Sequence, residues 1–398
     1  DDEEVVVVLV DLRPLVARHD VLDVEGMEVE VLGEPGALQR GRQRENGTLQ
    51  ELVDRHEVLR TAFKYKGLDV PLQIVLKEWS ADFVYHDLGH TIVQQEFICD
   101  FRKADREHLF DLSKDALMRL AVLQLADDEY ELLWSHHHII MDGWCLNILL
   151  SEFFEIYNSK QEHRPSRLPE AEPYSRYIKW LESRDKEEAR EYWKTYLQGY
   201  SEAARLAPQK LGREYLPEKL LHTVGADKLS ALQSLAASNQ ATVPHLLRAI
   251  WGLIVARYTG TRDVVFGEVI TGRPPELDNV ETMIGLFVDT IPVRVKLDEK
   301  DRFTDLLALV RHDSLAWEEY SHFPLNEIQS LSEIEGSLFD HLISFHNHSK
   351  VPTQSNNGAG NFSIVDSFEQ TNYDLVFDVH LSETLNLSFT YNAHVHDR

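Results

Sequence analysis

One segment constrains the fold of this chain more than any other: residues 132–138, an apolar run that ends in three consecutive histidines. An alternating apolar run over residues 117–125 precedes it, and a short polar turn joins the two. Two such runs around a tight turn predict a β-hairpin. Because neighbouring side chains of a strand point to opposite faces, we expect His136 and His138 to share one face and His137 to take the other.

A carboxylate and a glycine, Asp142 and Gly143, follow the histidines. Glycine lets the backbone turn tightly or pass close to a ligand. From residue 144 to residue 159 apolar side chains recur at the spacing of a helix. The pattern therefore predicts a strand that runs through a tight loop into a helix, with Asp142 folded back beneath the loop.

Three interpretations of the histidines are open from these residues alone. The first is a packed cluster in the protein core. The second is a zinc site made by His136 and His138, which needs a third ligand that no other His or Cys supplies at a diagnostic spacing. The third is acyl transfer, in which a neutral imidazole of His138 accepts a proton from an attacking amine or hydroxyl group.

The flanking sequence carries a resemblance. His137-His138-x-x-x-Asp142-Gly143 resembles the HHxxxDG motif of condensation domains of nonribosomal peptide synthetases. HxxxDG alone is shared with coenzyme A-dependent acyltransferases, so the other motifs distinguish the two families. These motifs occur in the order that condensation domains have. They are Arg55-His56-Glu57-x-Leu59-Arg60-Thr61-x-Phe63, Pro173-Tyr174-x-x-Tyr177-Ile178-Lys179-Trp180, Gly272-Arg273-Pro274 with 283–290 and Arg294, Phe323-Pro324-Leu325, and Asn372-Tyr373-Asp374-Leu375.

This resemblance implies an α+β fold of two chloramphenicol-acetyltransferase-like lobes arranged in a V, with the active site at their interface. We expect the N-terminal lobe, which carries HHxxxDG, to span residues 1–167. The C-terminal lobe would span residues 168–398 and be incomplete at its end. The proline-rich stretch 164–173 is the linker candidate, and residues 267–285 would cross from the second lobe beneath a substrate tunnel. The mixture of neighbouring strands and helices in both halves independently favours an α+β fold.

The resemblance also implies the reaction: peptide bond formation between an upstream aminoacyl or peptidyl thioester and the amine of a downstream aminoacyl thioester. Both substrates would arrive on the 4′-phosphopantetheine arms of carrier proteins, an upstream donor and a downstream acceptor, and an adenylation domain would be adjacent. The domain itself is expected to bind no cofactor and no metal. Gly143-Trp144-Cys145 is similar to the class that joins an L-configured donor to an L-configured acceptor.

By the same resemblance, His138 and Gly143 are the catalytic residues. His138 would act either as a general base or as a positioning hydrogen-bond donor, and the sequence leaves both roles open. The backbone N–H of Gly143 would stabilise the oxyanion or position the substrate.

Further residues would support this site. His137 would brace the strand from its opposite face. The resemblance implies a buried ion pair between Asp142 and Arg60, a partner that a buried carboxylate requires. From its position at the end of a helix alone, Arg60 could equally be a solvated cation beside the helix C-terminus. Trp144 and Thr271 are expected to line the substrate tunnel.

The composition limits the partners. Hydrophobic residues make up 43% and charged residues 27% of the chain, as in soluble globular proteins, and the net charge is −27. Because the acids are spread along the chain and no basic patch stands out, we expect no binding to nucleic acid or to a membrane. No signal-peptide pattern occurs. Two cysteines, Cys99 and Cys145, do not make a disulfide framework, so we expect a cytoplasmic protein.

Short strands and helices are expected along the rest of the chain. Residues 33–47 have the composition of a loop or of a poorly formed helix. Thr48-x-x-Glu51 has the sequence of a capping box, so we expect a helix to begin at Thr48. Residues 346–372 are polar and rich in small residues, and we expect them to form a mobile crossing loop. The other expected strands are 5–10, 27–32, 72–76, 220–224, 264–270, 291–297, 339–345, 373–381 and 385–391, and the other expected helices are 88–108, 174–181, 189–197, 227–237, 243–258 and 303–320.

Some features depart from the family pattern. The first 47 residues lack the usual Ser/Thr-Pro-x-Gln opening, to which Leu12-Arg13-Pro14-Leu15 comes nearest, and Asp289 stands where Asn is common. The chain stops at Arg398 where relatives continue, so we interpret it as a fragment of a larger synthetase. Two alternatives are a coenzyme A-dependent acyltransferase of the same fold, whose plant-type DFGWG motif is missing here, and a catalytically silent docking domain, whose motif is usually damaged.

Overall fold

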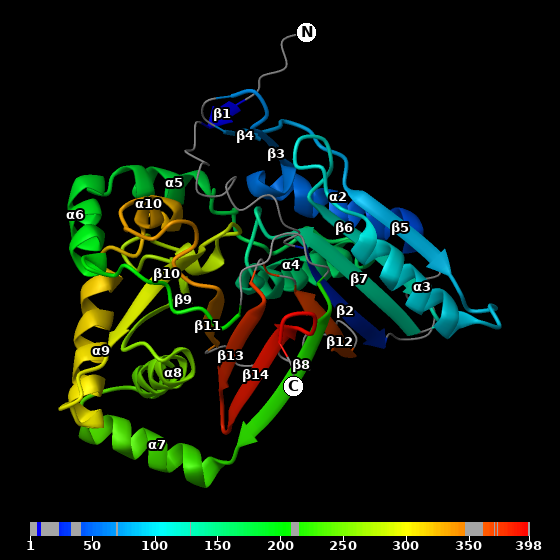
Figure 1. Ribbon diagram of the computed structural model, residues 1–398. Helices are drawn as coiled ribbons and strands as arrows, with labels where there is room; N and C mark the ends of the chain where they lie inside the picture. Colours follow the sequence, from blue (N-terminus) through cyan, green and yellow to red (C-terminus); the bar gives the residue numbers. More distant parts are fainter. Residues whose placement is uncertain are drawn as a thin grey trace. The chain divides into compact units, whose positions relative to one another are not determined.

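The computed structural model of the protein describes residues 6–8, 24–32, 41–68, 71–127, 129–207, 215–346, 361–369, 371 and 373–396. The chain divides into two compact units (Figure 1). Unit 1 consists of Asp1–Ser183, Arg273–Phe287 and Lys350–Asn372, and unit 2 of Arg184–Gly272, Val288–Ser349 and Tyr373–Arg398. The segment Arg273–Phe287 thus belongs to unit 1, although the residues on either side of it belong to unit 2. The lobe boundary expected at residues 167 and 168 stays a prediction.

Unit 1 contains a five-stranded sheet of order β12-β2-β7-β6-β5 and a three-stranded sheet of order β1-β4-β3. The expected hairpin is confirmed as β6 and β7, which pair antiparallel. The described elements of unit 1 are β1 (Val6–Val8), β2 (Val24–Leu32), α2 (Gly41–Arg55), the 3-10 helix η1 (Glu57–Arg60), β3 (Thr61–Lys64), β4 (Leu72–Val75), β5 (Asp82–Asp87), α3 (Gln94–Glu107), β6 (Met118–Gln124), β7 (Glu129–His137), α4 (Gly143–Gln161), α5 (Ser175–Glu182), the 3-10 helix η2 (Val280–Thr282) and β12 (Asn361–Glu369).

The larger sheet of unit 1 is covered on both faces. On one face, Trp134 of β7 packs edge-on against Phe153 of α4, with ring centroids 5.9 Å apart, in a cluster that also takes in Val122 of β6. On the other face, Leu123 of β6 packs with Ile98 of α3. A strand buried on both faces is mostly apolar, and its polar side chains need partners, as Arg119 has in Asp105 and Glu131 has in Arg102. The alternation expected over residues 117–125 is therefore incomplete, because both faces of β6 are buried.

Unit 2 is built on one six-stranded sheet of order β10-β9-β11-β13-β14-β8, in which β11 runs parallel to both of its neighbours. Trp193, Phe266 and Ile343 are fully buried in its core. The described elements are α6 (Lys186–Leu197), β8 (Pro217–Val224), α7 (Ala226–Ser238), α8 (Val243–Thr259), β9 (Asp263–Thr271), β10 (Val288–Lys296), α9 (Phe303–Glu318), α10 (Leu325–Ser330), β11 (His341–His346), β13 (Leu375–Leu381) and β14 (Leu385–Asn392).

The α+β class is confirmed, and most expected elements occur with small differences at their ends. Two expectations are wrong. Helix α2 begins at Gly41, so Thr48 lies inside the helix and does not cap it. Strand β12 occupies part of the loop expected over residues 346–372 and pairs antiparallel with β2. Four of its nine residues are Phe, Ile or Val, which favour strands, and the polar residues on either side obscured this signal.

Other predicted features fall partly outside the described residues. Only Val6–Val8 of the strand expected over residues 5–10 is described, as β1. Residues 12–15, which come nearest to the family opening, residues 33–40 of the expected loop and residues 347–360 lie outside the described part of the chain. Strands β3 and β5 are described but were not expected from the sequence.

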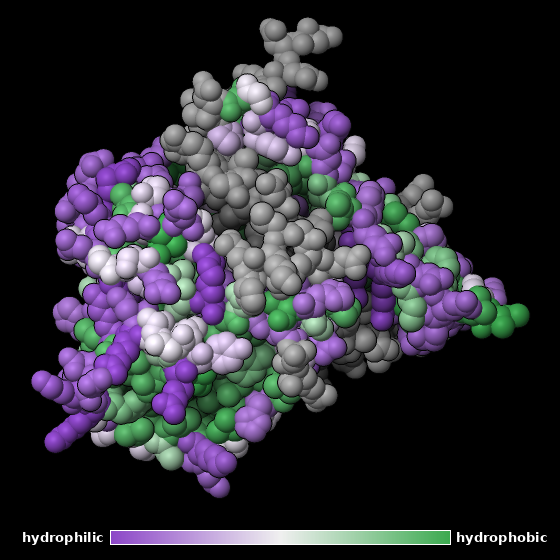
Figure 2. Space-filling view, viewed as in Figure 1, coloured by the Kyte–Doolittle hydropathy of each residue, from purple (hydrophilic) through white to green (hydrophobic). Residues whose placement is uncertain are grey.

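In Figure 2, hydrophilic residues cover much of the face in view on both units, and apolar residues form smaller patches between them. Within the described residues, no helix combines the length and the apolar character that crossing a bilayer requires.

Candidate active site

Strand β7 delivers the histidines from the middle of the five-stranded sheet, where it lies between β2 and β6. His136 pairs with Met118 of β6 and is fully buried. The strand ends at His137, one residue earlier than expected, so His138 is the first residue of the following loop. The interpretation as a packed core histidine therefore describes His136 and not His138.

His137 closes the turn that follows the strand. Its Nδ1 accepts a hydrogen bond from the Ile139 amide (3.1 Å), and its carbonyl accepts one from the Ile140 amide (3.2 Å). Its ring packs edge-on against Phe110, with centroids 6.3 Å apart. Because Nδ1 is the acceptor, a neutral His137 carries its proton on Nε2. His137 thus holds the turn from which His138 projects.

His138 is only partly buried, whereas its neighbours Ile139, Ile140 and Met141 are buried, with exposed fractions of 6%, 0% and 0%. The ring centroids of His136 and His138 lie 6.2 Å apart. Three buried apolar residues anchor the loop from below, so the loop cannot shift without exposing them. His138 therefore stands at the surface of unit 1 on a fixed support.

Gly143 is the first residue of α4 and is exposed. The first amides of a helix have no partner within the helix, and they lie at its electropositive end. No acceptor among the described residues receives a hydrogen bond from the Gly143 amide. This N–H is therefore available to an anionic or carbonyl oxygen.

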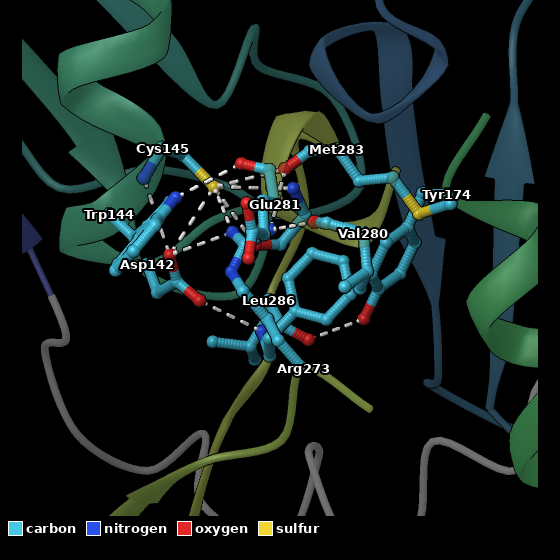
Figure 3. Close-up of polar contacts among 11 residues, drawn as sticks. Asp142, Trp144, Cys145, Tyr174, Arg273, Val280, Glu281, Met283 and Leu286 are labelled. Atoms are coloured by element: carbon cyan, nitrogen blue, oxygen red, sulfur yellow. Dashed lines mark hydrogen bonds and ion pairs between the residues drawn. The ribbon is translucent and has the colours of Figure 1, made fainter. Parts of the chain in front are cut away.

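Asp142 is the N-cap of α4 and is 5% exposed. Its Oδ1 accepts hydrogen bonds from the Cys145 amide (3.3 Å), the Cys145 thiol (3.3 Å) and Arg273 Nη2 (3.4 Å) (Figure 3). Its Oδ2 accepts one from the Phe287 amide (3.1 Å). A buried carboxylate is costly unless it is hydrogen-bonded and paired with a cation, and Asp142 meets both conditions.

The cation beside Asp142 is not the expected one. Arg273 makes this ion pair, and both side chains are 7% exposed. The guanidinium of Arg273 also donates to the carbonyls of Met283 (3.0 Å) and Val280, and it lies 3.9 Å from the ring centroid of Phe287. Arg60, at the end of η1, donates instead to the carbonyl of Leu76. The Arg60–Asp142 pair is thus replaced by one in which the cation belongs to the segment 273–287.

Tyr174, the residue just before helix α5, makes a second contact that holds the segment 273–287. The Tyr174 hydroxyl donates to the Leu286 carbonyl (2.6 Å) (Figure 3). A Cβ atom on Gly285 would lie 2.0 Å from Tyr174 Cδ2, so only glycine lets the backbone pass the ring. Burial, together with the nearby Tyr177 and Asp142, raises the pKa of Tyr174 well above its ordinary value, which keeps the hydroxyl protonated as a donor.

Two other expected site residues are exposed. Trp144 is 38% exposed, and its Nε1 donates to the carbonyl of Glu281 (3.1 Å). Thr271 is the exposed last residue of β9 in unit 2. The assignment of both residues to a substrate tunnel stays a prediction.

The motif residues Arg55 and His56 contact Glu152 of helix α4. His56 Nε2 lies 2.6 Å from Glu152 Oε2, and Arg55 Nε donates to the same oxygen (3.0 Å). Burial alone would raise the pKa of Glu152, but the hydrogen bonds and charges of His56 and Arg55 outweigh it and hold this pKa below its ordinary value. The cluster therefore fixes the end of α2 to the helix that Asp142 caps.

Sequence reasoning missed Arg273 and Cys145 as partners of Asp142. A signal was present, because Arg273 is the only Lys or Arg between residues 273 and 287 and lies in a recognised motif. What was missing was the fold of this segment, which brings it to the first turn of α4. Among the described residues, no group of three or more His, Cys, Asp and Glu side chains is placed to hold a metal ion.

Comparisons with known proteins bear on this arrangement. A family model described as "Condensation domain" matches residues 41–398. The chain is 38% identical over 391 residues to bacitracin synthase 3 of Bacillus licheniformis, covering 96% of this chain and 6% of that protein. It is 38% identical over 360 residues to tyrocidine synthase 3 of Brevibacillus parabrevis, covering 88% of this chain and 6% of that protein. The chain thus spans a small part of these relatives.

Solved structures share the fold. The X-domain from teicoplanin biosynthesis matches with a TM-score of 0.82 at 20% identity, over 98% of this chain and 89% of that one. The starter condensation domain of rhizomide synthetase matches with a TM-score of 0.76 at 16% identity, over 97% and 88%. The family model and the sequence relatives together assign the chain: it belongs to the condensation-domain family of nonribosomal peptide synthetases.

Proposed function

We propose that this domain forms a peptide bond between an upstream aminoacyl or peptidyl thioester and the amine of a downstream aminoacyl thioester. The single observation that carries the proposal is the position of His138, a partly exposed residue on a loop that the buried Ile139, Ile140 and Met141 hold in place. Family membership supplies the reaction class. The proposed substrates are carried on the 4′-phosphopantetheine arms of a donor and an acceptor carrier protein.

In the proposed reaction, the amine nitrogen attacks the thioester carbonyl carbon, and a C–N bond forms as the C=O becomes a tetrahedral oxyanion. The intermediate collapses as the C–S bond breaks, and the pantetheine thiolate leaves and takes up a proton. Holding both thioesters at one place supplies much of the rate. His138 would accept the proton of the attacking amine or fix the amine by a hydrogen bond.

The exposed N–H of Gly143 is the proposed donor to the oxyanion. It lies at the N-terminus of α4, where the helix dipole favours negative charge, and Asp142 fixes the cap. Asp142 cannot itself serve as the proton acceptor in this proposal, because its oxygens are occupied by Cys145, Arg273 and Phe287. Its role is to hold the loop and the helix terminus together.

The finer assignments rest on the motif sequence. Gly143-Trp144-Cys145 supports an L-configured donor and an L-configured acceptor. We propose the two carrier proteins and the adjacent adenylation domain as partners, with no cofactor held by the domain itself, and the cytoplasm as the site of action. Trp144, exposed beside Gly143, and Thr271 are the proposed tunnel residues.

The test is dipeptide formation from loaded carrier proteins. The chain is mixed with donor and acceptor carrier proteins charged with a panel of L- and D-amino acids, and the products are identified by mass spectrometry. His138→Ala should reduce the rate at least about 100-fold, the lower range for a general acid–base group, with an unchanged thermal midpoint. His90→Ala, on an exposed turn before α3, is the matched control and should retain full activity.

Three outcomes would overturn the proposal. Turnover of free acyl-coenzyme A, with none of the carrier-bound thioesters, would indicate a coenzyme A-dependent acyltransferase. No turnover of any substrate, with a folded wild-type chain, would indicate a docking domain. Full activity in His138→Ala would remove the imidazole from the chemistry.

A further inference from the structure

Cys145 occupies an unusual position in the network beneath the site. It is fully buried in the first turn of α4, two residues after Gly143. Its Sγ lies 3.2 Å from the Gly285 carbonyl oxygen, 3.3 Å from Asp142 Oδ1, 3.3 Å from Arg273 Nη2 and 3.4 Å from the Gly285 amide nitrogen (Figure 3). One sulfur atom thus contacts the N-cap carboxylate, its cation and both backbone groups of one glycine.

The charge balance of this cluster requires a neutral sulfur. Burial raises the pKa of the Cys145 thiol well above its ordinary value, and the Asp142 carboxylate adds to the effect. A protonated thiol can donate to Asp142 or to the Gly285 carbonyl, and its lone pairs accept from Arg273 and from the Gly285 amide. A thiolate would instead place a second negative charge beside a single guanidinium in a buried site.

We propose that Cys145 is a positioning residue for the reaction: its neutral thiol fastens the segment 273–287 to the first turn of α4 and so fixes the Asp142 cap and the Gly143 amide. The polar links of the thiol, and not only its volume, carry this role. Gly285 approaches the sulfur closely because the segment passes Tyr174 at a residue without a Cβ atom. This inference rests on the proposed peptide-bond-forming function.

The experiment compares Cys145→Ser and Cys145→Val in the dipeptide assay with loaded carrier proteins. Serine keeps a donor and acceptor at this position, whereas valine keeps the approximate volume and removes both. We expect Cys145→Ser to stay within about threefold of the wild-type kcat and Cys145→Val to lose about tenfold or more, which corresponds to losing one hydrogen bond to a charged group. KM for each loaded carrier should change less than about twofold, because uniform substrate binding is untouched.

A second readout needs no substrate. Hydrogen exchange at the amides of Gly285 and Phe287 should be faster in Cys145→Val than in the wild type and close to the wild type in Cys145→Ser. If Cys145→Val does not fold, Cys145→Ala provides the same comparison. The control is Cys99→Ser, which changes the other, exposed cysteine on α3 and should alter neither readout.

The inference is overturned if Cys145→Val retains the wild-type kcat, if Cys145→Ser is as slow as Cys145→Val, or if KM rises while kcat is unchanged. If the wild-type chain forms no dipeptide from any pair of loaded carrier proteins, the proposed function is refuted instead. In that case the exchange data still decide whether the thiol fastens the segment, so the two failures are distinguishable.

Discussion

Asp142 pairs with Arg273 and not with the expected Arg60, and this difference leads to a quantitative prediction. Arg273→Leu would leave the buried carboxylate of Asp142 without its cation. The side chains of Asp142 and Arg273 are each 7% exposed. Removing one partner of a buried ion pair costs about 3–5 kcal/mol. Arg60→Leu would remove only a hydrogen bond to the Leu76 carbonyl, a loss of about 1 kcal/mol.

Calorimetry of the purified chain measures this difference. For a folding unit of roughly 200 residues, each 1 kcal/mol shifts the midpoint by about 2–4 °C. Arg273→Leu should therefore lower the unfolding midpoint of unit 1 by roughly 6–20 °C, whereas Arg60→Leu should lower it by only about 2–4 °C. The two variants are a matched pair, because each replaces one arginine with the same apolar side chain.

A double mutant identifies the cause. Asp142→Asn retains the shape of the cap but carries no charge, so it no longer needs a cation. Combined with Arg273→Leu, it should restore part of the lost stability, with a coupling free energy of about 0.5–3 kcal/mol. The reasoning is refuted if Arg60→Leu is at least as destabilising as Arg273→Leu, or if the two effects at Asp142 and Arg273 simply add.

Three further substitutions test the packing around the site. Gly285→Ala should destabilise the chain by about 1–3 kcal/mol, because the new methyl group would clash with Tyr174; an unchanged urea midpoint would contradict this close approach. Gly47→Ala should stabilise it by about 0.5–1 kcal/mol, because Gly47 lies inside α2 and its Cβ meets only a lysine tip at 3.9 Å; a loss of stability would argue for a helix that starts at Thr48. Glu152→Gln should be less stable than the wild type at pH 7, and the difference should shrink as pH falls below 4.5, because a lowered pKa contributes stability only while the carboxylate is ionised; a pH-independent difference in urea titrations would count against the charged cluster.

Some elements around the site could be predicted from the sequence and others could not. The hairpin β6–β7 and the helix α4 follow from apolar periodicity, because both elements bury continuous faces. The start of α2 does not follow from local signals, since Thr48 has the neighbours of a capping residue and yet lies buried inside the helix. Strand β12 was equally hidden, because it lies between polar stretches and its partner β2 is more than 300 residues away along the chain.

The sequence by itself determined the candidates for the proposed chemistry: His138 and Gly143 stand in a motif whose spacing places them on either side of a loop between a strand and a helix. The tertiary structure alone decided what holds them there. Asp142 needs a buried cation, and Arg60 and Arg273 could both provide it, because both are arginines. Only the path of the segment 273–287 past Tyr174 and Cys145 selects Arg273, because an ion pair depends on distance in space and not on separation along the chain.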